Sequence, residues 1–556
     1  MIPASDDAGH IAGEAPDRSR ASPPTTRSDL VSPALPLASP LLPAPPRRPL
    51  PQARRRSFLA GGRFPPPAPA PVHQRKGCRL AMNLYVPPTI PPPRRPLGML
   101  ASVRAARRNV LGIIPDIAYA QPIVTGATGP ARWHMVQGPE GLRRIFLDNV
   151  ESYPKSEIMI RMLRSAVGAS LFTSEGAQWR WQRRAIAPVF TARNVAALAP
   201  LMTATAERAS GRLAACAGPA EMVREMLSAT FDVICEVALS GREHFDAGLY
   251  GAAITRYFQT VGRASLLDFL DLPPWVPRPG ELLGRGAVRT MHRMVAAAIR
   301  ARRAAGPSAT ADLLDYMIRA KDPESGRTMT PQDLLHNMQF FIVAGHETTA
   351  LALSWALHLL ANDQAAQERA RAEARAALGA RAAGASDLEA MPFGRAVLEE
   401  AMRLYPPVGM LARNALREDR LYDREVRPND TVFVNIYALH RHRRLWQRPD
   451  AFDPTRFAPE ATPPDRYAYL PFGAGPRVCV GANFAMMQAQ IIFSTLLARF
   501  RFTPAGPPPT PVMHMTIRPE PGVTLEATPL AAGGENRAAK SENGLVEPIG
   551  IEPTTS

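Results

Sequence analysis

The stretch FGAGPRVCVG, residues 472–481, places Cys479 in a loop that contains three glycines. Only four cysteines occur among the 556 residues, and none belongs to a C-x-x-C pair. Because glycine tolerates positive φ, Gly473, Gly475 and Gly481 are predicted to let the backbone approach the sulfur closely. Converging N–H groups and the N-terminus of the helix that follows would stabilise a thiolate there.

The loop by itself leaves two interpretations of Cys479 open. The first is an inert buried cysteine, which is the usual state of a free thiol in a protein. The second is a metal ligand in an apolar pocket capped by Phe472. Since the loop holds no second Cys or His, a metal there would have one protein ligand, and haem suits such a site because its porphyrin supplies four other donors.

The surrounding chain is predicted to be mainly helical. Thr330-Pro331-Gln332-Asp333 combines an N-cap residue, a first-turn proline and an acid at the third helical position. The apolar run that follows, to residue 363, would form about 45 Å of buried central helix. Further helices are expected at 393–405, which ends at a Pro-Pro pair, and at 481–500. Short strand-like pieces occur at 431–439 and 523–527, so we expect a mainly α fold with a small β subdomain.

The two ends of the chain differ from its middle. Residues 1–81 contain seventeen prolines and residues 529–556 are polar and irregular, so neither end is predicted to pack, which leaves 82–528 as the folded domain. Met82 is a plausible true start. No eighteen apolar residues run unbroken, so no transmembrane anchor is expected. The sparse, scattered cysteines fit a reducing compartment, and we expect a cytoplasmic protein.

The charge distribution argues against nucleic-acid binding. The formal net charge is +17, and residues 1–81 contribute twelve Lys/Arg against five Asp/Glu. The remaining excess is spread over the long domain without a dense basic run or interleaved aromatic residues, which is not the pattern of a nucleic-acid interface.

The pattern Phe472-x-x-Gly475-x-Arg477-x-Cys479-x-Gly481 resembles the haem-binding loop of the cytochrome P450 superfamily. Four other segments resemble that family in the expected order: Trp179 and Arg183 (W-x-x-x-R), AGHETT at 344–349 (the oxygen-binding groove), Glu400 and Arg403 (E-x-x-R), and FDPTRF at 452–457, which contains Arg456. The resemblance covers roughly residues 85 to 528. It implies the P450 fold, with haem b between the long central helix and the cysteine loop.

The resemblance also implies roles for individual residues. Cys479 would be the axial ligand of the haem iron, and the propionates would be held by Trp179, Arg183, Arg413 and Arg477. Glu347 and Thr348 would form an acid–alcohol couple that delivers protons, beside a helix irregularity at 345–349 where Gly345 leaves room for O₂. Glu400, Arg403 and Arg456 would form a buried structural triad.

Each of these motifs also has a simpler interpretation. Glu400 and Arg403 are three residues apart, and most such pairs are solvated and contribute little stability. Arg183 has Arg180 and Arg184 as neighbours and would then be one surface arginine among several. HETTA at 346–350 begins like the zinc motif H-E-x-x-H, but Ala350 stands where the second histidine would be, so His346 is expected only to pack.

The implied function is monooxygenation of a hydrophobic substrate by O₂. No flavin or nicotinamide fingerprint occurs, so electrons would come from a ferredoxin or flavodoxin with its NAD(P)H reductase. Arg180, Arg184 and the HRHRR run at 440–444 could steer such an acidic partner, or be plain solvated charge. The alternatives are a peroxide-driven peroxygenase and a non-catalytic haem-thiolate sensor. The loops near 155–172, 255–275 and 405–412 would face the substrate. The AGHETT segment weakly favours a fatty-acid-like substrate.

Overall fold

The computed structural model describes residues 84–95, 97–128, 131–238, 246–260, 279–306 and 312–531. Residues 1–81, residues 532–556 and part of the loop at 255–275, which was expected to face the substrate, lie outside the described residues. The division into 1–81, 82–528 and 529–556 therefore stays a prediction.

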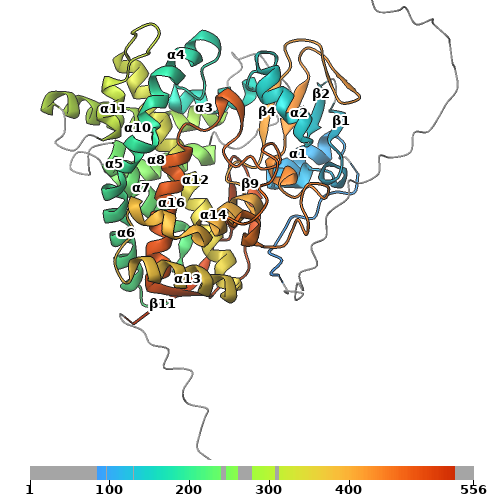
Figure 1. Ribbon diagram of the computed structural model, residues 1–556. Coiled ribbons are helices and arrows are strands. Elements are labelled where there is room, and N and C mark those ends of the chain that lie inside the picture. The colour runs from blue at the N-terminus through green and yellow to red at the C-terminus, as the bar shows by residue number, and fades with distance from the viewer. Residues whose placement is uncertain are drawn as a thin grey trace, which may run out of the picture. The chain divides into compact units, whose positions relative to one another are not determined.

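The described chain is mainly helical, as expected, with four small sheets (Figure 1). The helices are α1 (Met99–Arg108), α2 (Pro139–Arg143), α3 (Glu157–Val167), α4 (Gly176–Ile186), α5 (Ala192–Ala197), α6 (Ala199–Ala214), α7 (Met222–Ala238), α8 (Ala247–Thr260), α10 (Pro279–Ala305), α11 (Leu313–Arg319), α12 (Pro331–Asn362), α13 (Gln364–Leu378), α14 (Pro392–Leu404), α15 (Ile436–Leu439) and α16 (Ala482–Arg499). The strands are β1 (Ile123–Thr128), β2 (Ala131–Val136), β3 (Ala220–Glu221), β4 (Leu411–Asn414), β5 (Asp419–Leu421), β6 (Arg424–Val426), β7 (Thr431–Val434), β8 (Phe500–Pro504), β9 (Thr510–Met513), β10 (Ile517–Glu520) and β11 (Thr524–Pro529).

Helix α12 is the central element, and its start confirms the expected capping. Thr330 accepts from the Asp333 N–H at 3.1 Å, and the Asp333 carboxylate accepts from the Thr330 N–H at 3.1 Å. The helix packs against α7, α10, α14 and α16, so it is surrounded by helices (Figure 1). Among the helices of the described residues, only α12 is long and apolar enough to cross a membrane, but 78% of that window is buried, which makes it a core helix.

The helices on both sides of the cysteine loop also match the sequence. α14 ends at Leu404, because proline at 406 disfavours helical backbone in the residue before it. α16 begins at Ala482, directly after the loop, and packs against α6, α12 and α13. The cysteine loop is therefore held at the start of a helix that contacts the central one.

The largest sheet has the order β1-β2-β7-β4, and only β2 and β7 in it are parallel. The predicted strand at 523–527 is confirmed within β11. The predicted strand at 431–439 is only half right, since β7 ends at Val434 and α15 follows. All four residues of α15 are buried, so this segment lacks a solvated face and turns into the core instead of extending β7, which lies between β2 and β4 in the sheet.

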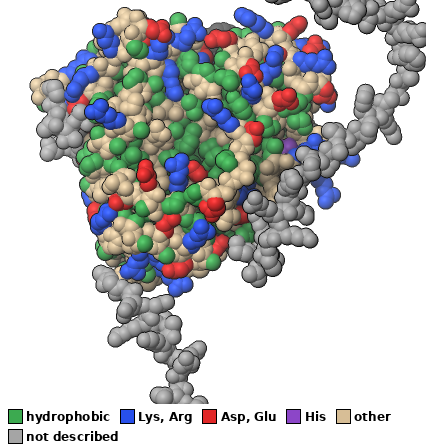
Figure 2. All heavy atoms as spheres, in the orientation of Figure 1, with side chains coloured by type: hydrophobic (Ala, Val, Ile, Leu, Met, Phe, Trp, Pro, Cys, Tyr) green, Lys and Arg blue, Asp and Glu red, His purple; other side chains and the backbone are tan. Residues whose placement is uncertain are grey.

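The visible face carries charged side chains of both signs. Lys and Arg side chains alternate with Asp and Glu over this face, with hydrophobic groups between them, and they form no continuous basic area there (Figure 2).

Candidate active site

The loop around Cys479 is shaped by backbone hydrogen bonds and two glycines. The Cys479 N–H donates to the Phe472 carbonyl at 2.9 Å, and the Val478 N–H donates to the Gly475 carbonyl at 3.1 Å. Gly473 has φ 73° and Gly475 φ 70°, a region in which L side chains are disfavoured. Gly481 lacks the positive φ expected of it, since its φ is −91° and it serves as the N-cap of α16, but its N–H does approach the Cys479 sulfur as predicted.

Replacement of the two turn glycines should destabilise the protein to different extents. A Cβ at Gly475 would lie 1.9 Å from the Phe146 carbonyl oxygen, whereas a Cβ at Gly473 meets nothing within 4 Å. Gly475→Ala should destabilise the protein by about 2–5 kcal/mol, since strain and overpacking add, while Gly473→Ala should cost only about 1–2 kcal/mol. Haem bound per protein and the unfolding midpoint measure this, and equal losses in both variants would contradict the role of the Phe146 contact.

The Cys479 thiol is accessible yet surrounded by protein. Its residue is exposed, but burial of the sulfur raises the pKa of Cys479, and the Gly481 N–H and the positive charge of Arg183 act in the opposite direction. The residue is thus accessible, although protein atoms surround its sulfur. A bound metal ion would stabilise the thiolate form beyond what the N–H and the guanidinium achieve.

Four cations gather near this loop: Lys155, before α3; Arg183, on α4; Arg413, on β4; and Arg477, within the loop. Lys155 pairs in a β-bridge with Arg413. Burial lowers the pKa of Arg413 to about 10, and burial together with the charge of Arg477 lowers the pKa of Lys155 to about 7. The pKa of Arg183 is also lowered by burial, with Cys479 as its nearby counter-charge.

Negative charge is scarce in this cluster. Glu175 pairs with Arg477 and lies 3.9 Å from Lys155. Arg183 and Arg413 form no ion pair with any carboxylate of the described chain, although Arg413 is buried. Trp179 lies under the Arg477 guanidinium at 4.2 Å. Glu175 is thus the one carboxylate of the described residues that pairs with any of these four cations, and the positive charge that remains uncompensated suits the two propionates of haem. No motif pointed to Lys155, which sequence reasoning missed.

On α12, three positions are partly accessible in an otherwise buried stretch: Ala344, Gly345 and Thr348. They share one helical face, which is the accessible face of α12 in this stretch. The Thr348 hydroxyl donates to the Ala344 carbonyl at 2.9 Å. His346 only packs, as expected: it is buried, with Nδ1 2.9 Å from the Ile342 carbonyl oxygen.

One expectation for the backbone of α12 is wrong. The helix is continuous through 345–349, without the expected irregularity. Gly345 serves helix packing as well, because a Cβ there would lie 2.9 Å from Ile234 Cδ1 on α7. A side chain at this position would have to displace the end of the Ile234 side chain.

Glu347 and Thr348 are not hydrogen-bonded to each other. The buried Glu347 carboxylate accepts through Oε1 from Thr516 Oγ1 at 2.6 Å and from Arg518 Nε and Nη2 at 2.9 and 2.7 Å. Consecutive helical residues point about 100° apart, so the acid faces β10 and the alcohol faces its own helix. Sequence reasoning missed Thr516 and Arg518, because nothing local marks them.

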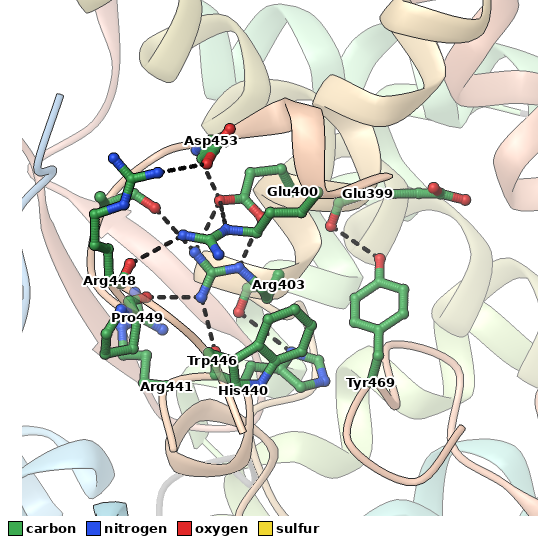
Figure 3. A network of polar contacts seen from close by, with 12 residues as sticks. Glu399, Glu400, Arg403, His440, Arg441, Trp446, Arg448, Pro449, Asp453 and Tyr469 are labelled. Atoms are coloured by element: carbon green, nitrogen blue, oxygen red, sulfur yellow. Dashed lines mark hydrogen bonds and ion pairs between the residues drawn. The ribbon is translucent and has the colours of Figure 1, made fainter. Parts of the chain in front are cut away.

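The expected buried triad forms, and Figure 3 shows it joined to the segment at 440–453. Arg403 binds Glu400 through Nε and Nη2 at 2.7 and 2.8 Å, and both side chains are fully buried. Arg456 Nε lies 3.4 Å from Glu400 Oε1. The remaining Arg403 donors bind the carbonyls of His440, Pro449 and Ala451.

The triad is connected to the cysteine loop through His440. Its Nε2 accepts from the Leu470 N–H at 2.8 Å, two residues before Phe472. Burial lowers the pKa of His440 to about 3, so the ring stays neutral and remains an acceptor. The triad thereby supports the shape of the loop that presents Cys479.

Loss of charge in the triad should be costly. Glu400→Gln is expected to destabilise the protein by about 3–5 kcal/mol, because it leaves Arg403 buried without its counter-ion. The neighbouring Glu399→Gln is the matched control, since Glu399 pairs at 3.1 Å with Arg395, which is 56% exposed, and its loss should cost less than about 1 kcal/mol. Chemical unfolding measures both losses of stability. Similar losses would show that the buried triad contributes no more than an exposed ion pair.

Most of the arginines expected to steer a redox partner already form ion pairs with carboxylates of the chain or are buried. Arg184 pairs with Asp322 at 2.7 Å and Arg180 with Glu151 at 3.2 Å. The expectation for the HRHRR run is wrong for its first three residues, 440–442, which are buried. Of the other two, Arg443 pairs with Asp116 and Arg444 is exposed.

A mainly helical fold with a long central helix, and with a cysteine loop beside a cluster of cations that outnumber their carboxylate partners, is the architecture of a haem-thiolate protein. The family model for cytochrome P450 matches residues 98–527, and the chain belongs to this family. It is accordingly an enzyme of the P450 monooxygenase class, for which a haem cofactor is implied.

Relatives with similar sequences come from bacteria and mammals. Cyclooctatin synthase of Streptomyces melanosporofaciens is 29% identical over 447 residues, covering 80% of this chain and 94% of the relative. Cyclooctat-9-en-7-ol 5-monooxygenase of the same organism is 30% identical over 457 residues, covering 78% and 93%. Cytochrome P450 4F3 of Rattus norvegicus is 29% identical over 473 residues, covering 80% and 90%.

Proposed function

We propose that this protein binds haem b and inserts one oxygen atom of O₂ into a hydrophobic substrate. The observation that carries the proposal is the group of partly buried cations, Lys155, Arg183, Arg413 and Arg477, beside the accessible thiol of Cys479. When bound, the haem supplies the activation of O₂ and its reaction with a C–H bond.

The residues of the chain have separate tasks in this proposal. Cys479 binds the iron through its sulfur, and the four cations with Trp179 hold and orient the propionates. Gly473 and Gly475 shape the loop, and the triad around Glu400 keeps it in place. Thr348, on the accessible face of α12, positions a proton donor, with Glu347 as the acid behind it.

Electrons come, in this proposal, from a ferredoxin or flavodoxin and its NAD(P)H reductase. Because Arg180 and Arg184 are already paired, long-range steering by these two arginines should be weak, and docking should depend little on salt. We place the protein in the cytoplasm, consistent with free Cys216, Cys235 and Cys479 in the described chain.

The test compares three electron supplies in the haem-loaded protein: a surrogate ferredoxin system with NADPH and O₂, hydrogen peroxide alone, and neither. Substrates are first chosen by shifts of the haem Soret band. The probes are cyclooctat-9-en-7-ol, which occurs in the name of one relative, and a long-chain fatty acid. Product from NADPH and O₂ supports the proposal. Product from peroxide alone would identify a peroxygenase, and absence of product under all conditions would indicate a binding protein.

A further inference from the structure

The loop that follows α3, residues 168–172, is bound to two helices through histidines. His336 on α12 accepts through Nδ1 from the Ala169 N–H at 3.2 Å, and His292 on α10 lies with Nε2 2.7 Å from the Ala166 carbonyl oxygen at the end of α3. The centroids of the two imidazole rings are 6.4 Å apart. The two histidines thus join the end of α3 and the loop to α10 and α12.

The two histidines differ in what protonation does to these bonds. Because an N–H group needs an acceptor, Nδ1 of His336 carries no hydrogen while it binds the Ala169 N–H. A carbonyl oxygen only accepts, so His292 donates through Nε2 and keeps its bond whether its ring is neutral or charged. Protonation of His336 therefore breaks its bond to the loop, whereas protonation of His292 leaves its bond to α3 in place.

The surroundings of His336 keep its ring neutral near pH 7. A Cβ at Gly168 would lie 2.3 Å from this ring, so the backbone of the loop covers it. Burial and the charge of His292 lower the pKa of His336, and Asp333, three residues earlier on α12, acts in the opposite direction. The other charged residues within one helical turn of these contacts have exposed side chains: Arg164, Arg289 and Arg293. Since an unperturbed histidine titrates near about 6.5, the bond to the loop is complete above that pH and is lost as the pH falls below it.

The loop ends at an aromatic residue beside the accessible face of α12. Phe172 lies against Phe340 with a centroid distance of 5.7 Å. Phe340 is partly accessible and lies four residues, about one helical turn, before Ala344, the first position of that face. Asn337 on the same helix accepts through Oδ1 from the Leu171 N–H at 2.8 Å, so α12 also binds the loop directly before the aromatic residue. A displacement of the loop would therefore move the side chain that adjoins the accessible face.

We propose that His336 is a positioning residue for the substrate: in its neutral form it holds the loop so that Phe172 packs on Phe340, and in its protonated form it releases the loop. The inference rests on the proposed function, because it takes the accessible face of α12 as the side on which a hydrophobic substrate lies. Substrate then binds less tightly in acid, since a released loop has to be ordered again on binding.

Lys155 is a second titratable group that reaches this loop. Its ammonium group donates to the Phe172 carbonyl, and its pKa is lowered to about 7 by burial and the charge of Arg477. Lys155 loses its charge as the pH rises, so its titration would weaken the hold on the loop in base. His336 acts in the opposite direction, and substitution distinguishes the two groups.

The first experiment measures the loop itself in the haem-loaded protein without substrate. His336→Asn places an acceptor oxygen near the position of Nδ1 and cannot be protonated in this range, so it should keep the bond to the loop at every pH. Backbone hydrogen exchange of residues 168–172 should be equal in the wild type and in His336→Asn at about pH 8, and about threefold faster in the wild type at about pH 5. Comparison at the same pH removes the intrinsic pH dependence of exchange. Arg293→Gln is the control, since this exposed arginine of α10 binds Thr290 of its own helix, and its exchange should follow the wild type.

The second experiment connects the loop to the substrate site. The probe is phenylimidazole, because its nitrogen binds haem iron and its apolar ring then occupies the space beside α12, and its affinity is measured from the shift of the Soret band. The wild type and His336→Asn should bind the probe equally at about pH 8, whereas at about pH 5 the wild type should bind it about threefold more weakly. Both proteins meet the same form of the probe at each pH, so its own titration cancels. His336→Leu, which offers no acceptor, should bind the probe about threefold more weakly than His336→Asn at both pH values.

These results separate the inference from the proposed function. Equal exchange in the wild type and His336→Asn at about pH 5 would overturn the release of the loop, and an equal pH dependence in both proteins would assign the titration to another group such as Lys155. Faster exchange in acid with unchanged probe affinity would overturn the role in substrate positioning. Absence of NADPH-dependent product in the wild type would instead refute the proposed function, while the pH-dependent exchange of the loop would remain.

Discussion

Cys479→Ser is expected to abolish the long-wavelength absorption band of the reduced carbon monoxide complex and to reduce monooxygenase turnover at least about 10³-fold, which corresponds to ~4 kcal/mol in the barrier. A serine hydroxyl is a poor anionic ligand, so the iron loses the thiolate that donates electron density to it. The loop should keep its shape, because the Cys479 N–H to Phe472 bond and the two turn glycines do not involve the sulfur.

The measurement is the carbon monoxide difference spectrum together with product formation per haem. Cys216→Ser is the control, since Cys216 is an exposed cysteine at the end of α6 and should leave both readouts unchanged. A thiolate-type band that persists in Cys479→Ser would show that another residue binds the iron, and the assignment of the cysteine loop would be wrong.

Thr348→Ala is expected to uncouple electron consumption from product formation. Among the described residues the hydroxyl bonds only to the Ala344 carbonyl, at 2.9 Å, so its removal should leave α12 intact. The reaction consumes protons as well as electrons, and protons that arrive without positioning divert O₂ to hydrogen peroxide. Positioned proton transfer contributes about 10²–10⁴-fold in rate, so product per NADPH should fall sharply while NADPH oxidation continues.

The neighbouring threonine supplies a control on the same helix turn. Thr349 is buried, and its hydroxyl has no hydrogen-bond partner in the structure, so Thr349→Ala should leave the stoichiometry of NADPH, peroxide and product at the wild-type value. If Thr348→Ala also kept the wild-type product per NADPH, Thr348 would be no more than a helical residue and the assignment of the accessible face would fail.

Several parts of the fold were predictable because short-range rules decide them. The capping box at Thr330 and Asp333, the stop of α14 before Pro406 and the positive φ at Gly473 and Gly475 each depend on residues at most four positions apart. The Glu400–Arg403 pair belongs to the same class, since three residues on a helix bring the side chains together.

Other parts were not predictable, because they depend on which elements distant in sequence pack against a residue. Gly345 suggested room for a ligand, but the structure shows a close approach of Ile234 from α7. The HRHRR run suggested a charged surface, but its first three residues are buried. Lys155 belongs to no sequence motif. Its place in the cation cluster is evident only in the folded chain, where burial and the charge of Arg477 lower the pKa of Lys155 to about 7.

The sequence by itself determined the family, the cysteine loop and the central helix, because glycine stereochemistry, capping and helical spacing act within a few residues of the chain. The tertiary structure decided which charges are paired. Arg518 is 171 residues from Glu347 and Arg184 is 138 residues from Asp322, and each pair forms only because separate elements pack together. Electrostatic interaction depends on distance and burial in space, so the partners of a buried charge are known only once the chain is folded.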